Sequence, residues 1–288
     1  MFILLIFFYI ILMNTIKNLV IAGGGAKNLA VVGLLQKINI DSVINYAAVS
    51  SGSILVYLLS IGYTPLELEE VAIELDLTQL MGEPSLENLL LSKSITNLNN
   101  IKIVLQILTN YKFSSDSVTF SQLFTQTNKI LHIGATSLSE SKFIIFNKTN
   151  TPHVNIIDAM LASCSIPGIF PPYKINNKYY CDGYLFNNCP FDLFKNDLQH
   201  TIAIIFELHN YSQNFNIFEY LSFTLSMPST SISKKIILDY PNNIIVLKKN
   251  NLPIIDFNLN KIKIKTIINH GKNLNNLLNK ESFTKLFS

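Results

Sequence analysis

Two short apolar runs each end in a glycine-bearing turn that leads into a segment with helical spacing. No other feature constrains the fold as much. Residues 19–25 read LVIAGGG, and residues 27–38 then carry apolar side chains every three or four positions. Residues 46–52 read YAAVSSG and lead into a second helical pattern over residues 51–61. Buried strands that alternate with helices are typical of a mainly parallel sheet with helices on both faces.

The rest of the chain continues this alternation. We therefore predict an α/β fold of three layers, with a mainly parallel central sheet between helices. No internal repeat and no Pro- or Ser-rich linker divides the chain, which favours one domain over residues 18–288. Further strands are expected at 130–136, 142–146, 179–181, 201–206 and 244–247, and helices over most of 64–112, at 155–163 and from about 262 onward.

An apolar segment, residues 1–17, precedes this domain. Its first thirteen residues read MFILLIFFYIILM and carry no charge. That stretch is shorter than the roughly 20 residues needed to cross a bilayer, and it lacks the basic start and small-residue cleavage site of a signal peptide. Three interpretations stay open: an anchor at the membrane surface, a weak signal sequence, or an upstream start codon with Met13 as the true start.

The charge and the cysteines exclude several function classes. Lys and Arg total 22 against 19 Asp and Glu, and the net charge of +3 is too small to indicate nucleic-acid binding. The three cysteines, Cys164, Cys181 and Cys189, form neither an even disulfide framework nor a zinc pattern. We expect a cytoplasmic protein, peripheral at membranes if the first segment is an anchor, without a metal or a cofactor.

The second glycine-bearing turn has the form of a nucleophile elbow. Parallel sheets place their sites at the carboxyl ends of strands, where this turn lies. An elbow exposes a serine between a strand and a helix, with small residues two places before and after it. Ser50 stands in the serine position, with Gly52 after it and Ala48 where glycine is usual. The alternative is a helix cap by Ser50 or Ser51.

The first glycine-bearing turn suits an anion. Successive glycines let backbone N–H groups converge, and the following helix adds a favourable dipole. Asn28 stands where a dinucleotide fingerprint needs its third glycine, and no P-loop GK[ST] follows. An oxyanion hole formed by Gly23, Gly24 and Gly25 remains, with a simple tight turn as the alternative.

Three further features place the chain beside a known family. Asp182-Gly183 follows a predicted strand, and residues 162–172 read ASCSIPGIFPP. Alone, an Asp-Gly pair is usually only a turn. Together with the glycine loop, Lys27 two places after it, and the serine elbow, these motifs resemble the patatin-like phospholipase family over roughly residues 18–210.

The resemblance implies a role for each matched residue. It makes Ser50 the nucleophile and Asp182 its base, with Gly23, Gly24, Gly25 and Lys27 around the oxyanion hole. Ala48, Gly52 and Gly183 are then the small residues that support the turns. Asn28 and Ala48 depart from the family pattern, in which glycine is usual at both positions.

The resemblance implies that Asp182, and not a histidine, acts directly on Ser50. The five histidines, at 132, 153, 200, 209 and 270, lie in no motif. An ordinary Asp titrates near 3.9 and is a weak base at neutral pH, but burial raises its pKa. Tyr180 to Leu185 provide apolar neighbours for Asp182.

We therefore expect a lipid acyl hydrolase of the phospholipase A type that works through an acyl-enzyme on phospholipid or another acyl lipid, in contact with a membrane surface. The alternatives are a weak or inactive relative that binds lipid or a protein partner, and an acyltransferase.

Overall fold

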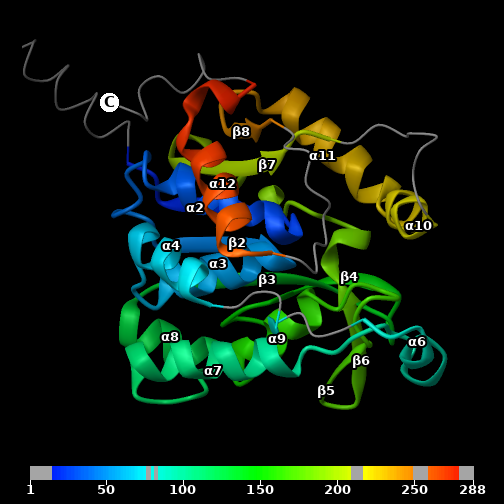
Figure 1. The fold of residues 1–288 in the computed structure, drawn as a ribbon. Helices are drawn as coiled ribbons and strands as arrows, with labels where there is room; N and C mark the ends of the chain where they lie inside the picture. Colours follow the sequence, from blue (N-terminus) through cyan, green and yellow to red (C-terminus); the bar gives the residue numbers. More distant parts are fainter. Residues whose placement is uncertain (1–14, 76–78, 81–83, 209–216, 249–258, 279–288) are drawn as a thin grey trace, which may run out of the picture.

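The computed structural model describes residues 15–75, 79–80, 84–208, 217–248 and 259–278. Within these ranges one sheet of eight strands lies between two layers of helices, as Figure 1 shows. The strand order is β5-β6-β3-β2-β1-β7-β8, and β4 pairs with β3 beside this path. This arrangement confirms the predicted three-layer α/β fold. The strands are β1 Asn18–Ile21, β2 Asn45–Val49, β3 Ile130–Ser137, β4 Lys142–Phe146, β5 Tyr173–Ile175, β6 Lys178–Asp182, β7 Thr201–Phe206 and β8 Ile244–Leu247.

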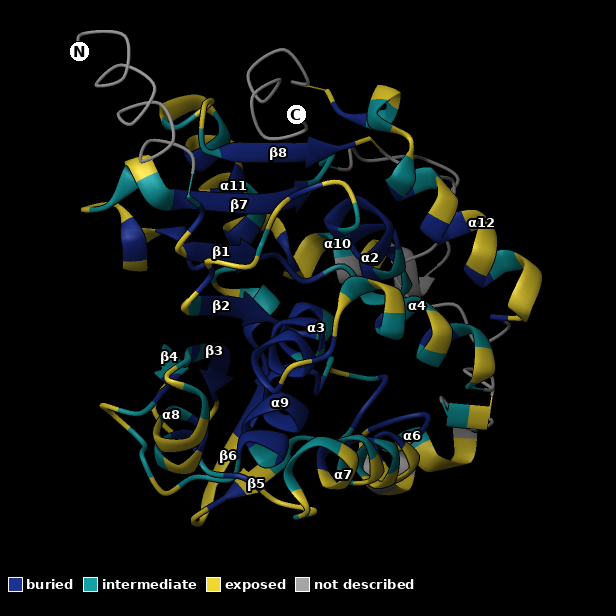
Figure 2. Cartoon of the chain, turned by 90° about the vertical axis from the view of Figure 1, so that its left-hand side faces the viewer, coloured by how far each residue is buried: buried dark blue, intermediate teal, exposed yellow. Residues whose placement is uncertain are grey.

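The sheet is mainly parallel, as predicted. Strands β3, β2, β1, β7 and β8 run in one direction, and β4 and β6 pair antiparallel with β3. Every residue of β1 and β8 is buried, and so is every residue of β7 except the partly exposed Phe206. These strands appear mostly in dark blue in Figure 2. Strands covered on both faces read as continuous apolar runs, which explains the sequence pattern.

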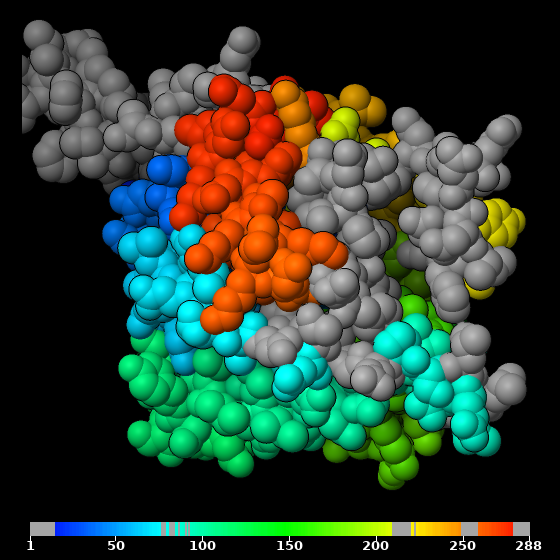
Figure 3. Space-filling view, viewed as in Figure 1, coloured from blue at the N-terminus to red at the C-terminus, as the bar shows by residue number. Residues whose placement is uncertain are grey.

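Side chains that alternate along β1 divide the interior into two cores. Leu19 and Ile21 belong to the larger core, and Val20 belongs to the smaller one. The larger core lies under α2, α3, α9 and α12, and the smaller lies under α11 and the short turns after β6. Figure 3 shows α12 lying against α4 on the outer surface of the helices that cover the larger core. The helices are α2 Asn28–Leu35, α3 Ser51–Ser60, α4 Pro65–Glu74, α6 Leu86–Ser92, α7 Asn99–Phe113, α8 Phe120–Thr127, α9 Ile156–Ser163, α10 Ile217–Leu225, α11 Met227–Asp239 and α12 Lys261–Lys272.

Local signals set several of these boundaries. The Thr64 hydroxyl caps α4 by accepting from the Glu67 N–H, and the Glu67 carboxylate accepts from the Thr64 N–H. Pro65 begins the helix. The structure also contains elements that the sequence patterns did not predict, namely β5, α8, α10 and α11. The described residues from 217 onward therefore hold more helix than expected.

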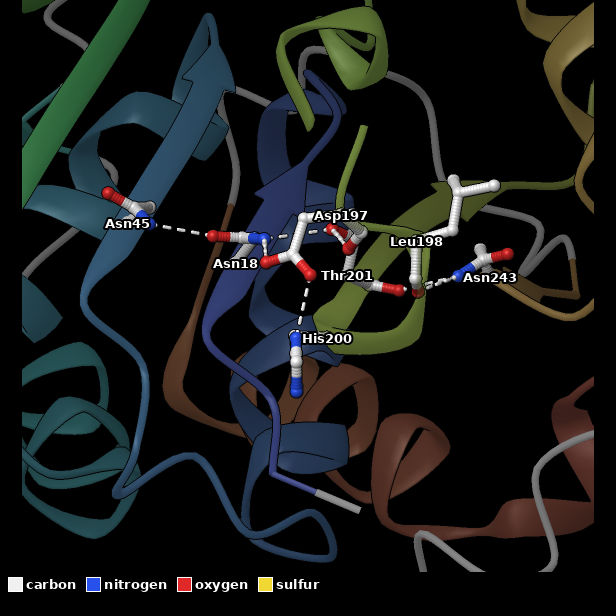
Figure 4. Close-up of polar contacts among 7 residues, drawn as sticks. All are labelled: Asn18, Asn45, Asp197, Leu198, His200, Thr201 and Asn243. Atoms are coloured by element: carbon white, nitrogen blue, oxygen red, sulfur yellow. Dashed lines mark hydrogen bonds and ion pairs between the residues drawn. The ribbon is translucent and has the colours of Figure 1, made fainter. Parts of the chain in front are cut away.

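Polar side chains tie together the amino ends of the parallel strands (Figure 4). Asn18 donates to Asp197 Oδ2 at 3.0 Å and to Thr201 Oγ1 at 2.9 Å, and it accepts from Asn45 at 2.7 Å. Asn243 donates to the carbonyls of Leu198 and Thr201, at 2.6 and 2.9 Å. This network connects the strands at their amino ends. The carboxyl ends of β1 and β2, where the glycine-bearing turns begin, lie on the opposite side of the sheet.

The expectation for the apolar start of the chain falls on residues 1–14, which lie outside the described ranges. The division between residues 1–17 and 18–288 stays a prediction. None of the helices in the described ranges has the length and apolar character needed to cross a bilayer.

Candidate active site

The turn after β2 holds Ser50 in a strained backbone conformation. Its φ of 55° and ψ of −139° lie in a region that side-chain-bearing residues rarely adopt. Such a conformation costs about 1–3 kcal/mol and persists only where the surroundings impose it. Ser50 directly precedes α3 without capping it through its side chain, so the simple helix-cap interpretation does not describe this residue.

Hydrogen bonds hold the Ser50 backbone on both sides. Its N–H donates to the Ser163 Oγ at 2.7 Å, and its carbonyl accepts from the Ser53 Oγ at 2.6 Å. The Ser163 hydroxyl in turn donates to the Gly134 carbonyl at 2.6 Å. These contacts fix the turn, and sequence patterns alone did not identify Ser53 or Ser163.

The Ser50 hydroxyl donates to Asp182. The Oγ lies 2.6 Å from the Oδ2 of Asp182, and the other carboxylate oxygen accepts from the Tyr184 N–H at 2.9 Å. Asp182 is completely buried. This burial raises the pKa of Asp182 to about 7, while the hydrogen bonds from Ser50 and Tyr184 act in the opposite direction. The carboxyl group therefore changes its charge near neutral pH, as a general base should.

The register of β3 explains why two residues so distant in sequence meet. Strand β3 lies between β2 and β6. Val49, which precedes Ser50, pairs with Gly134, and Asp182 pairs with Ala135. The two side chains therefore leave their strands at nearly the same level of the sheet. Asp182 is further held by its backbone, since its carbonyl accepts from Thr136 Oγ1 at 2.9 Å and its N–H donates to the Ser165 carbonyl at 2.9 Å.

The glycine loop passes directly beside the nucleophile elbow. A Cβ atom at Gly23 would lie 2.9 Å from the Ser50 Cβ and 2.5 Å from Asn188 Oδ1, so only glycine fits there. The Gly23 N–H donates to Asn188 Oδ1 at 2.9 Å, and the Asn188 amide returns a bond to the Gly23 carbonyl at 3.0 Å. Gly23 thus shapes the loop, and its N–H and carbonyl are both held by Asn188.

Asn28 takes a defined place behind this loop. Its amide donates to the Ser51 Oγ at 2.7 Å and to the Ala22 carbonyl at 3.2 Å. Ser51 Oγ also accepts a longer bond of 3.4 Å from the Gly24 N–H. The residue that departs from the family pattern therefore connects the glycine loop to the elbow. Its buried Oδ1 has no hydrogen-bond partner within the described part of the chain.

The remaining predicted residues lie around the same turns. A Cβ at Gly52 would lie 2.8 Å from the carbonyls of Ile21 and Ala22, and one at Gly183 would lie 2.6 Å from the Gly134 carbonyl. Ala48 is fully buried in the larger core, which accommodates its methyl group. Lys27 is buried below the loop, and its N–H donates to the Gly24 carbonyl at 3.1 Å.

Three of the histidines in the described ranges make hydrogen bonds away from Ser50 and Asp182. His132 contacts Asn147, His200 contacts Asp197, and His270 contacts Asn276 and the Lys248 carbonyl. Burial lowers the pKa of His132 to about 4, which keeps this ring neutral. Over the ranges that the structure describes, no three His, Cys, Asp or Glu side chains gather as a metal site requires.

Comparisons with known proteins identify a family for this chain. Residues 19–195 match the family described as patatin-like phospholipase. The chain is 36% identical over 186 residues to probable lipid hydrolase 463L of Invertebrate iridescent virus 6, an alignment that covers 62% of each protein. It is 31% identical over 264 residues to uncharacterized protein R571 of Acanthamoeba polyphaga mimivirus, covering 85% of this chain and 88% of that protein.

Two solved structures share the fold. VipD from Legionella pneumophila superposes with a TM-score of 0.58 at 13% identity, covering 94% of this chain and 67% of that one. The type III effector ExoU superposes with a TM-score of 0.55 at 15% identity, covering 94% of this chain and 53% of that one. The chain thus spans about half of ExoU and under two thirds of the iridescent-virus protein.

Proposed function

The chain belongs to the patatin-like phospholipase family, and on that premise we propose that it cleaves acyl ester bonds of lipids with Ser50 as nucleophile and Asp182 as general base. The observation that carries the proposal is the 2.6 Å hydrogen bond from the Ser50 hydroxyl to a completely buried carboxylate. A serine needs an adjacent base to attack an ester, and the Asp182 carboxylate lies within hydrogen-bond distance of Ser50. The name of the iridescent-virus relative, a probable lipid hydrolase, supports the same class of reaction.

The first half of the reaction forms an acyl-enzyme. Ser50 Oγ attacks the ester carbonyl carbon while Asp182 takes the hydroxyl proton. The carbonyl oxygen becomes an oxyanion, which the N–H groups of Gly24 and Gly25 stabilise. The bond to the leaving alkoxide then breaks, and Asp182 returns the proton to it. Ser50 now carries the acyl group, and the alcohol or lysolipid leaves.

The second half releases the acid. Water attacks the acyl carbon as Asp182 removes a proton, and the tetrahedral intermediate collapses with return of that proton to Ser50. The fatty acid departs and the dyad is restored. Because Asp182 must give up a proton near neutral pH and regain it, its pKa of about 7 suits both roles.

A lipid substrate implies contact with a bilayer or micelle surface, and we extend the proposal to peripheral action there. Transfer of the acyl group to an alcohol differs only in the acceptor for the second half. The intact Ser50–Asp182 contact and the bonded position of Asn28 favour an active enzyme over a binding protein.

The test uses mixed vesicles of phosphatidylcholine and an anionic phospholipid with radiolabelled acyl chains. Purified wild-type protein should release labelled fatty acid, and Ser50→Ala and Asp182→Asn should not. Ser60→Ala is the matched control, because Ser60 is a buried serine at the end of α3, the helix that follows Ser50, and its hydroxyl donates to the Tyr57 carbonyl. Release that is equal in Ser50→Ala and wild type rejects the proposal. A second sample with a monoacylglycerol acceptor distinguishes hydrolysis from transfer by the product formed.

A further inference from the structure

Ser163 is a fully buried serine outside the pair of reacting residues, and it touches the nucleophile's backbone instead of its side chain. It is the last residue of α9, in the segment that precedes β5. Its Oγ accepts from the Ser50 N–H at 2.7 Å and donates to the Gly134 carbonyl at 2.6 Å. One hydroxyl therefore links the elbow to strand β3.

This link joins the two halves of the dyad through one strand. Gly134 pairs with Val49, and its neighbour Ala135 pairs with Asp182. The Ser163 hydroxyl, which donates to the Gly134 carbonyl, is thus held at a fixed distance from the end of β6 that carries Asp182. Because the Ser50 N–H donates to the same hydroxyl, Ser50 is held in place relative to Asp182.

The hydrogen bonds of Ser163 matter because the backbone of Ser50 is strained. A residue with φ of 55° relaxes toward ordinary values unless its neighbours prevent it. Ser53 holds the carbonyl side of the Ser50 peptide, and Ser163 holds the N–H side. Without the Ser163 hydroxyl, the buried Ser50 N–H and the Gly134 carbonyl would each lose a partner. Rotation of the Ser50 peptide would then move Oγ away from Asp182.

We propose that Ser163 is a positioning residue that holds the Ser50 elbow in register with Asp182 through the contact of its hydroxyl with the Ser50 N–H and the Gly134 carbonyl. This inference rests on the proposed function of Ser50. It assigns Ser163 no contact with substrate and no proton transfer in the reaction.

The experiment measures the rate and the final extent of Ser50 labelling by a fluorescent fluorophosphonate. Ser163→Ala is compared with wild type and with Ser60→Ala, which removes another buried serine hydroxyl from the region of the fold around α3. We expect Ser163→Ala to label between about 10- and 100-fold more slowly, since a small displacement of a reacting atom has effects of this size. The final extent should equal that of wild type. A variant that merely unfolds in part would show a reduced extent instead.

Ser163→Cys keeps the test decisive if the alanine variant fails to fold. A thiol nearly preserves the volume of the side chain but donates and accepts hydrogen bonds weakly. The folded cysteine variant should therefore label more slowly than wild type, with an unchanged KM for a soluble ester and a lower kcat. Labelling of either folded variant within about twofold of wild type overturns the role of Ser163.

The wild-type sample separates this inference from the proposal on which it rests. Wild-type protein that is folded and does not label at Ser50 contradicts the proposed function, and the role of Ser163 falls with it. Normal wild-type labelling together with normal labelling of Ser163→Ala rejects only the positioning role.

Discussion

The hydroxyl of Ser50 lies 2.6 Å from the carboxylate of Asp182, although 132 positions of the sequence separate them. Two opposing effects act on this carboxylate. Burial raises its pKa, and the hydrogen bond from Ser50 lowers it, with burial dominant. In the proposed function, the charge of Asp182 therefore controls the reactivity of Ser50.

The first prediction concerns the dependence of activity on pH. Only the ionised form of Asp182 accepts the Ser50 proton, and its pKa lies at about 7. We expect kcat/KM for a soluble ester to rise through about pH 7 and to level off above it. A pH profile in buffers of constant ionic strength measures this. A rate that is constant from acidic to alkaline pH would contradict Asp182 as the base.

The second prediction concerns stability. The pKa of Asp182 is raised from 3.8 to about 7 on folding, so the folded protein holds a proton that the unfolded chain releases between these values. Stability from this group is full below pH 3.8 and is lost as the pH rises to about 7. The loss is on the order of 4 kcal/mol, because each pKa unit corresponds to about 1.36 kcal/mol.

Asp182→Asn removes this titration. Urea unfolding of wild type and Asp182→Asn at pH 5 and pH 8 isolates the contribution, because the other groups titrate in both proteins. We expect the wild type to lose stability relative to the variant as the pH rises. Equal changes in the two proteins would show that the carboxyl group is not buried as described.

The third prediction compares two glycines that meet close neighbours in different parts of the fold. A Cβ at Gly23 would approach Ser50 and Asn188, whereas one at Gly33 would lie 2.0 Å from the Ile268 carbonyl where α2 crosses α12. Gly23→Ala should lower kcat by about 100-fold or more, because it displaces the glycine loop whose N–H groups are proposed to hold the oxyanion. Gly33→Ala should instead lower the free energy of unfolding, by about 1–3 kcal/mol or more, and leave kcat of the folded protein intact. Steady-state kinetics and urea unfolding on both variants test the contrast, and an inverse pattern would refute it.

The fourth prediction addresses the amino ends of the strands. Asn18→Ala removes the donor to Asp197 and Thr201 and the acceptor for Asn45, all buried or partly buried. We expect the free energy of unfolding to fall by about 1–3 kcal/mol. Since this network lies at the edge of the sheet opposite Ser50, kcat should not change. A large loss of kcat without a loss of stability would mean that the two edges are coupled.

The sequence patterns predicted the parallel strands and the helices that follow them, because apolar runs and turn residues are local signals. They did not predict β5, a strand of three residues, or α11, whose first half is rich in serine. Helix α8 does have a local start signal in the sequence, because Thr119 and Gln122 form a capping box there.

The site was predicted in a different way. The roles of Ser50 and Asp182 came from resemblance to a family, since nothing in their spacing indicates that β3 lies between their strands. Contacts made by Ser163, Asn188 and Asn28 depend on which loops meet at the end of the sheet. Such polar contacts follow from the tertiary arrangement, and no short sequence window contains them.

Labelling with a fluorescent fluorophosphonate tests most directly whether Ser50 is an activated nucleophile. Folded wild-type protein, Ser50→Ala, Asp182→Asn and the control Ser60→Ala are incubated at pH 8, and the labelled site is identified by peptide mass spectrometry. We expect labelling of wild type and Ser60→Ala at Ser50, none of Ser50→Ala, and sharply slower labelling of Asp182→Asn. Absence of labelling in folded wild-type protein, or undiminished labelling of Ser50→Ala, would contradict the Ser50–Asp182 dyad.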